Sequence, residues 1–242
     1  MIKTIEYRSW KSFVHDYKND LFGNDMFKKG RILFRGQSDS TWRLTSSFDR
    51  RYGRYEWSLR QQIEKDLIEN FRNNCIRHLD NSFVCGLDDI QIKNMAQHYG
   101  IPTRLLDWTD SPFVAAYFAF STAISSASKV AIWGLDTEHE IWHSDIGVNI
   151  QKEFLVYNER QKNQRGCFTV LNAPQSSVDE FVEVASLSRK GGDALVKMII
   201  PALEYKQAMS ELDAMNISAS TIMGGIEGCA LSALWETELK YL

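Results

Sequence analysis

Apolar residues recur at helical spacing in two segments of the N-terminal third of the chain. Between Trp10 and Tyr17 they follow Ser9, whose hydroxyl suits an N-cap, so the pattern predicts a short helix after Ser9. From Leu59 to Cys75 every fourth residue is apolar, which predicts a long amphipathic helix over Trp57–Cys75. We expect this fourfold ladder to pack against the core rather than to carry chemistry.

Capping signals place two further helices in the middle of the chain. Asp88 with Gln91 three residues later forms a capping box, so a helix is expected from about Asp89 to Tyr99. Gly100 suits a left-handed cap there, and the following proline stops the helix. Ser111 followed by proline starts the next helix, which is nearly all apolar or small and should be buried on most sides through Ile124.

Short apolar runs bounded by turn residues predict the strands of a sheet. The predicted strands are Arg31–Gly36, Thr103–Trp108, Lys129–Leu135, Gly166–Leu171 and Ala194–Ile200. A further short strand is expected near the C-terminus, at Ser220–Met223. A helix is expected over Leu203–Met215, and a terminal helix is expected after the segment Gly224–Gly228, so that Glu227 precedes it. Such short, irregularly spaced strands favour a single mixed α+β domain over residues 1–242, with residues 1–30 as a helical lead-in.

Composition narrows the class of protein without identifying its chemistry. The chain has 242 residues, ordinary charge and normal hydrophobic content, as expected of a soluble globular protein. It shows no stretch of about 20 apolar residues and no apolar signal core at its start, so a cytoplasmic protein with no membrane partner is expected. The four cysteines lack metal-ligand spacing, which favours free thiols and no metal site.

Charge is distributed unevenly along the chain. Residues 1–78 contain 16 Lys plus Arg against 10 Asp plus Glu, a formal charge of +6, and the remainder carries 12 against 21, or −9. This asymmetry has two readings: scattered solvated charge, or a basic face that meets RNA or DNA.

Polar groups of several kinds are concentrated between Met95 and Phe120, where some have two readings. Arg104 and Asp107 are an odd number of residues apart on a predicted strand, so they should point to opposite faces. Arg104 then either forms a structural ion pair or binds a phosphate. For Asp107 the pattern favours a structural role. His98 can move a proton near neutral pH or simply bond carbonyls at a helix end, and for Tyr117 core packing is the default.

Three blocks of sequence resemble the FRG-domain family, which is named for a Phe/Tyr-Arg-Gly motif. They are Phe34-Arg35-Gly36, the run from Ala96 to Ala119, and Asn158-Glu159-Arg160 with the segment Gln164 to Thr169. The resemblance spans roughly residues 31–235, which we take as the FRG core.

The layout of that family in turn resembles ADP-ribosyltransferases, which split NAD inside a small split sheet. The resemblance implies a catalytic set of Arg35, Thr109 and Glu227. Glu227 would stabilise the oxocarbenium-like ribose, Arg35 would bind diphosphate or ribose, and Gly36 would let nicotinamide approach the backbone. It also implies that NAD is bound by seven residues: Arg35, Gly36, Gln37, His98, Arg104, Thr109 and Tyr117.

The expected function is therefore that of an NAD-dependent ADP-ribosyltransferase, with NAD as substrate and nucleic acid as the favoured acceptor. The resemblance to toxin-like bacterial members implies a role in antiphage defence or in a toxin-antitoxin system, with a neutralising antitoxin protein as partner. Glu227 is not part of a Glu-x-Glu pattern, which argues against arginine modification on proteins. The alternatives are a non-catalytic sensor of a nucleotide or partner, and an NAD hydrolase.

Overall fold

The computed structural model describes residues 1–23, 25, 28–79, 84, 86–121, 128–142, 147–151, 166–187 and 192–241. Within them one seven-stranded sheet has the order β1-β7-β4-β2-β3-β6-β5. Its strands are β1 (Ile2–Glu6), β2 (Ile32–Gln37), β3 (Leu105–Thr109), β4 (Lys129–Asp136), β5 (Gly147–Gln151), β6 (Gly166–Asn172) and β7 (Leu195–Pro201). β1 pairs with β7 in parallel, and the other pairs are antiparallel.

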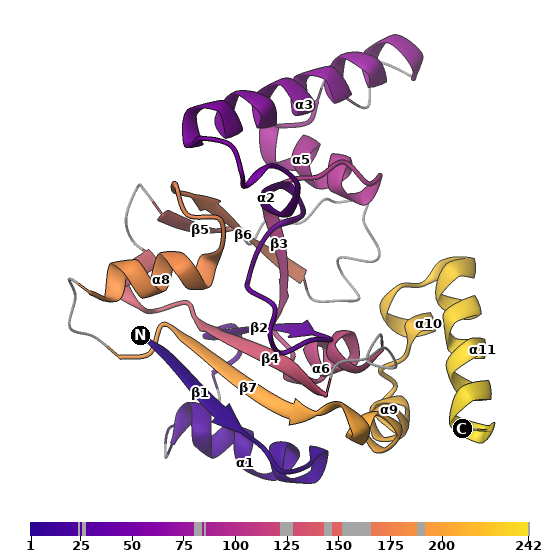
Figure 1. Ribbon diagram of the computed structural model, residues 1–242. Helices are drawn as coiled ribbons and strands as arrows, with labels where there is room; N and C mark the ends of the chain where they lie inside the picture. The colour runs from indigo at the N-terminus through magenta and orange to yellow at the C-terminus, as the bar shows by residue number, and fades with distance from the viewer. Residues whose placement is uncertain are drawn as a thin grey trace.

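The helices lie around this sheet as Figure 1 shows. They are α1 (Trp10–Phe22), α2 (Ser47–Tyr52), α3 (Trp57–His78), α5 (Asp89–His98), α6 (Pro112–Phe120), α8 (Val178–Ser186), α9 (Tyr205–Ala214), α10 (Ala219–Ile222) and α11 (Gly225–Tyr241), with 3-10 turns at Glu140–Trp142 and Ala202–Glu204. The mixed α/β class expected from the sequence is therefore confirmed.

The two faces of the sheet bury separate apolar clusters. One cluster joins α1, α6, α9 and α10 to β2, β4 and β7, with Trp10, Phe34 and Phe120 fully buried in it. The other lies under α8 on the opposite face and includes Trp108 and Trp133. A third, smaller cluster joins α3 to α5. The helix pair α3 and α5 thus packs as a unit beside β3, away from α1 (Figure 1).

The sheet is divided between β2 and β3. These strands share a single residue pair, Phe34 with Thr109, whereas β2 pairs with β4 at six positions and β3 pairs with β6 at five. Arg35 and Gly36 on β2 therefore have no ladder partner on β3, and the strands diverge beyond Phe34. This opening brings the end of β2 to face Asp107 across a gap.

Local capping signals predicted the helix starts correctly. Ser9 and Asp88 both form capping boxes, and the Ser111 hydroxyl accepts a hydrogen bond from Val114 N at the start of α6. Gly100 has a φ of 85°, the left-handed conformation expected of it. The predicted end of the α6 helix at Ile124 lies outside the described residues.

Other expectations from the pattern are wrong or hold only in part. The lead-in of residues 1–30 contains β1 as well as α1, and β1 adds an edge strand to the sheet. Residues Ser220–Met223 form no strand, because Ser218 and Thr221 cap the short helix α10 there. The fourfold ladder on α3 is only partly buried: Leu59 is 47% exposed, and the buried side chains are Arg60, Ile68 and Cys75.

Candidate functional site

A cavity of about 860 Å³ opens where β2 and β3 diverge. Its walls come from β2, β3, the start of β6, α2, α5, α6 and the loop between β2 and α2. The lining residues are Phe34, Arg35, Gly36, Gln37, Ser38, Trp42, Arg43, Thr45, Arg50, Asn94, Gln97, His98, Asp107, Trp108, Thr109, Ala115, Phe118, Gly166, Cys167 and Phe168. Its volume falls within the roughly 300–1,000 Å³ usual for ligand sites.

Arg35 and Asp107 face each other across the opening. Nη1 of Arg35 donates to the backbone carbonyl of Asp107 at 2.7 Å and lies 3.9 Å from the carboxylate Oδ2. The buried Nε of Arg35 has no hydrogen-bond partner among the described residues. Arg35 lines the cavity and 21% of its side-chain surface is accessible, so its charged, planar guanidinium is suited to bind an anion.

The carboxylate of Asp107 remains open to the cavity, with 59% of its side-chain surface accessible. Burial raises the pKa of Asp107, and the charge of Arg35 acts in the opposite direction. A carboxylate with a perturbed pKa and a specific charged neighbour in a cavity is a candidate for catalysis. Among the lining residues described, Asp107 is the one with a carboxylate.

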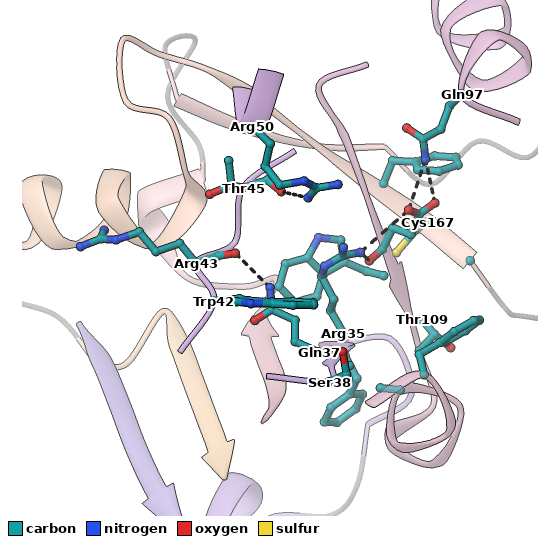
Figure 2. Close-up of a pocket in the computed structure, with 18 of the residues that line it drawn as sticks. Arg35, Gln37, Ser38, Trp42, Arg43, Thr45, Arg50, Gln97, Thr109 and Cys167 are labelled. Atoms are coloured by element: carbon teal, nitrogen blue, oxygen red, sulfur yellow. Dashed lines mark hydrogen bonds and ion pairs between the residues drawn. The ribbon is translucent and has the colours of Figure 1, made fainter. Parts of the chain in front are cut away.

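Gln97 fixes the orientation of this carboxylate. Its Nε2 donates to Oδ1 and Oδ2 of Asp107 at 3.0 and 3.2 Å (Figure 2), while its Oε1 accepts from the hydroxyl of Thr103. The amide must present its NH2 to Asp107, because an ionised carboxylate can only accept hydrogen bonds. Its oxygen is then free to accept from Thr103. Gln97 on α5 thereby links the helix to β3 and holds the acid in place.

The glycine of the Phe-Arg-Gly motif has a packing reason. A Cβ at position 36 would lie 1.9 Å from the carbonyl oxygen of Ala115 and 2.6 Å from the nitrogen of Ala119. Gly36 is therefore needed for α6 to pack directly on β2. Gly36 also lines the cavity, and the expectation that it lets nicotinamide approach the backbone stays a prediction.

Two other sequence-predicted residues line the cavity but have their polar groups engaged. Gln37 is buried, accepts from the indole of Trp133 at 2.8 Å and donates to the carbonyl of Arg43 at 3.0 Å, which anchors the loop after β2 (Figure 2). The hydroxyl of Thr109 accepts from Ser111 N at 3.2 Å, so it helps to start α6. His98 lines the cavity from the last residue of α5 and contacts the ring of Tyr99.

Three sequence-predicted site residues lie outside the cavity lining. Arg104 is 3% exposed, with Nε 3.3 Å from Glu64 and its guanidinium 4.4 Å from the ring centroid of Trp57, so it forms a structural ion pair. Tyr117 is buried in the α6 cluster, where burial raises its pKa to about 12, and its neighbour Phe118 lines the cavity instead. Glu227 is exposed in the first turn of α11.

Asp107 and Gln97 are the residues whose importance the sequence pattern understated. The expectation that Arg104 and Asp107 point to opposite faces is consistent with their separate surroundings. The signal for Asp107 in the sequence was its position as the single charged residue of the strand Leu105–Thr109, in which the structure shows it to be the exposed side chain. Asn158, Glu159, Arg160, Gln164 and Arg165, which carry part of the family resemblance, lie outside the described residues.

The described residues contain no group of three or more His, Cys, Asp or Glu side chains that could hold a metal ion. Cys75 and Cys167 are buried and Cys229 is exposed, all without disulfides, and Cys85 is not among the described residues. In the part of the chain with assigned structure, every helix is too short or too polar to cross a membrane.

Comparison with known proteins gives one match. No curated protein and no solved structure matches the chain. The model of the FRG domain family matches residues 30–128, which include β2, β3, α5 and α6 and therefore Arg35, Gln97 and Asp107. This match supports the resemblance of the chain to the FRG-domain family in the segment that builds most of the cavity.

Proposed function

We propose that the cavity binds NAD and that the protein is an NAD-dependent ADP-ribosyltransferase that modifies nucleic acid. The observation that carries the proposal is the placement of a partly accessible guanidinium, that of Arg35, beside the accessible carboxylate of Asp107 at the opening between β2 and β3. NAD needs both, because it carries a diphosphate and develops positive charge on one ribose as nicotinamide leaves.

The charges around the cavity agree with this ligand. Arg35 and Arg50 both line it, and each offers planar donors that match a phosphate. The side chain of Arg43 points away from the cavity in Figure 2 and lies 3.5 Å from Asp179 and from Glu183. Arg35 and Arg50 are therefore the arginines assigned to the diphosphate, and Asp107 is left to face the ribose.

The proposed reaction breaks the bond between nicotinamide and the ribose carbon. The electron pair of that bond leaves with nicotinamide, and an oxygen or nitrogen of the acceptor attacks the same carbon and loses a proton. Ionised Asp107 stabilises the positive charge that develops on the ribose and can accept the proton of the acceptor. If water is the acceptor, the same steps release free ADP-ribose.

Asp107 takes the role that the resemblance assigned to Glu227. Glu227 is exposed on α11 and does not line the cavity, whereas Asp107 is oriented within it by Gln97. Thr109 and His98 remain candidates for contact with the ribose, since both line the cavity.

The test is to incubate the pure protein with labelled NAD and total RNA, DNA or cell lysate. We expect label on nucleic acid, a loss of about 10²–10³-fold in rate for Asp107→Asn, and near wild-type rates for Glu227→Gln. Free ADP-ribose without a labelled macromolecule would instead identify a hydrolase. Tight NAD binding in calorimetry without any turnover would identify a sensor, and equal activity of wild type and Asp107→Asn would reject the assignment of the acid.

The proposed setting is that of a toxin in antiphage defence or in a toxin-antitoxin pair, with a neutralising antitoxin protein as partner. The support for a nucleic acid target is the formal charge of +6 over residues 1–78. We expect expression of the wild-type protein in bacteria to arrest growth. Asp107→Asn, expressed to the same level, is expected to leave growth unaffected; arrest by both would reject the toxin role of the enzyme.

A further inference from the structure

A second cavity of about 430 Å³ adjoins the first. It is lined by Ser47, Arg51, Gly100, Ile101, Pro102, Leu105 and Leu106, and by four residues that also line the first cavity, Arg35, Arg50, Gln97 and Asp107. The Arg35–Asp107 contact therefore stands at the boundary between the two. Ligands in the two cavities would both reach Asp107.

The charge of the second cavity selects the class of ligand. Three arginines line it, Arg35, Arg50 and Arg51, against one acidic residue, Asp107. Arg50 is held in place because its Nη1 donates to the carbonyl of Thr45 at 2.8 Å, and Arg51 lies exposed beside it at the end of α2. A cavity with this balance attracts a polyanion and repels a cationic side chain such as that of arginine.

The remaining wall is apolar. Ile101 and Pro102, which are half-buried, provide its apolar surface, and the backbone of Leu105 and Leu106 on β3 adjoins them. A flat apolar group attached to a phosphate matches such a combination, and a nucleotide unit has both parts. The small volume admits a base only when it is unpaired and unstacked, as in a single strand or a flipped nucleotide.

We propose that the second cavity is the acceptor site and that it takes one unpaired nucleotide of a single-stranded nucleic acid. Arg51 and Arg50 bind the phosphodiester, and the base lies against the wall of Ile101 and Pro102. Placing the acceptor there rests on the proposed function, whereas the binding of single-stranded nucleic acid by this cavity does not. Asp107 would then lie between the NAD ribose and the acceptor nucleotide.

The test measures binding without any turnover. Fluorescence anisotropy of short labelled single-stranded RNA and DNA gives Kd for the wild type, Arg51→Gln and Arg51→Glu at several salt concentrations. We expect Arg51→Gln to weaken binding about tenfold at low salt and to reduce the slope of log Kd against log salt by about one. Arg51→Glu should weaken it further.

Arg54→Gln is the matched control, because Arg54 lies three residues away, carries the same charge and lines neither cavity. It should bind the oligonucleotide like the wild type. Equal losses for Arg51→Gln and Arg54→Gln would overturn the site, as would duplex DNA binding as tightly as the single strand. Competition by polyglutamate as strong as that by an oligonucleotide of equal charge would overturn nucleic acid as the ligand.

NAD binding, measured separately by calorimetry, distinguishes failure of this proposal from failure of the proposed function. Arg35→Gln should weaken both ligands because Arg35 lines both cavities. Binding of the oligonucleotide that depends on Arg51, without any binding of NAD, would retain the second cavity as a nucleic acid site and reject the transferase. NAD turnover with oligonucleotide binding unaffected by Arg51 would reject the acceptor site alone.

Discussion

Nη1 of Arg35 lies closer to the backbone carbonyl of Asp107, at 2.7 Å, than to its carboxylate, at 3.9 Å. The guanidinium therefore occupies the gap left by the missing ladder between β2 and β3, and it does not close a tight ion pair. Both charged groups keep capacity for a ligand.

The rate of NAD cleavage should depend on the ionisation of Asp107. Burial raises the pKa of Asp107, so the acid limb of kcat/KM for NAD should lie at higher pH than the ordinary aspartate value of 3.8. The limb is expected to disappear in Asp107→Asn. A pH–rate profile of the two proteins checks this, and an acid limb that persists in the variant would assign it to another group.

The raised pKa of Asp107 should also make the free energy of unfolding depend on pH. Because the folded-state pKa of Asp107 is raised, ionisation of this group opposes folding. The difference in unfolding free energy, wild type minus Asp107→Asn, should be constant below about pH 3.9 and fall as pH rises through the folded-state pKa. Urea denaturation at several pH values measures it. A difference that increases with pH would contradict the shift.

Loss of the Gln97 amide should impair catalysis by releasing the acid. In Gln97→Ala the two hydrogen bonds to the carboxylate disappear, and they favour its charged form. We expect kcat to fall by about tenfold and the acid limb to move further up in pH. Thr103→Val should act in the same direction, since the hydroxyl orients Gln97, and Thr103→Ser should restore the wild-type profile. An unshifted profile in Gln97→Ala would mean that its role is purely structural.

Gly36→Ala should destabilise the fold. The added Cβ would meet the backbone of α6 at 1.9 Å, and a helix backbone cannot yield as a flexible side chain does. We expect a loss of about 1–3 kcal/mol or more in unfolding free energy, measured by denaturant titration. Gly192→Ala is the control, because its Cβ meets nothing within 4 Å and its φ is not in the left-handed region. Equal stability of the two variants would contradict the packing role.

Arg104→Ala should reduce stability without weakening NAD binding by the folded protein. Its guanidinium is buried against Trp57 and pairs with Glu64, so removal leaves a largely buried carboxylate with one partner fewer. The expected loss is about 3–5 kcal/mol. Arg72→Ala, which removes a pair with the exposed Asp89, should lose at most about 1 kcal/mol. If calorimetry shows that folded Arg104→Ala binds NAD more weakly than the wild type, Arg104 would instead have a phosphate-binding role.

Much of the local structure could be predicted from the sequence, because it depends on interactions within a few residues. The capping boxes at Ser9 and Asp88, the left-handed Gly100 and the Ser111-Pro112 start of α6 are all local hydrogen-bond or backbone requirements. Such signals fix where an element begins, whatever it later packs against. β1 carried no comparable signal, since it is an edge strand whose side chains are mostly exposed.

The site was only partly predictable, because its geometry depends on contacts between residues that are far apart in the sequence. Arg35 could be selected as a strand-end arginine, but its contact with Asp107 depends on strands 72 residues apart that diverge after one pair. Sequence alone therefore determined the α/β class, the helix caps and the Arg35-Gly36 motif. Tertiary structure alone decided that Gly36 serves helix packing, that Asp107 faces the cavity and that Glu227 does not, because long-range strand pairing and packing set these positions.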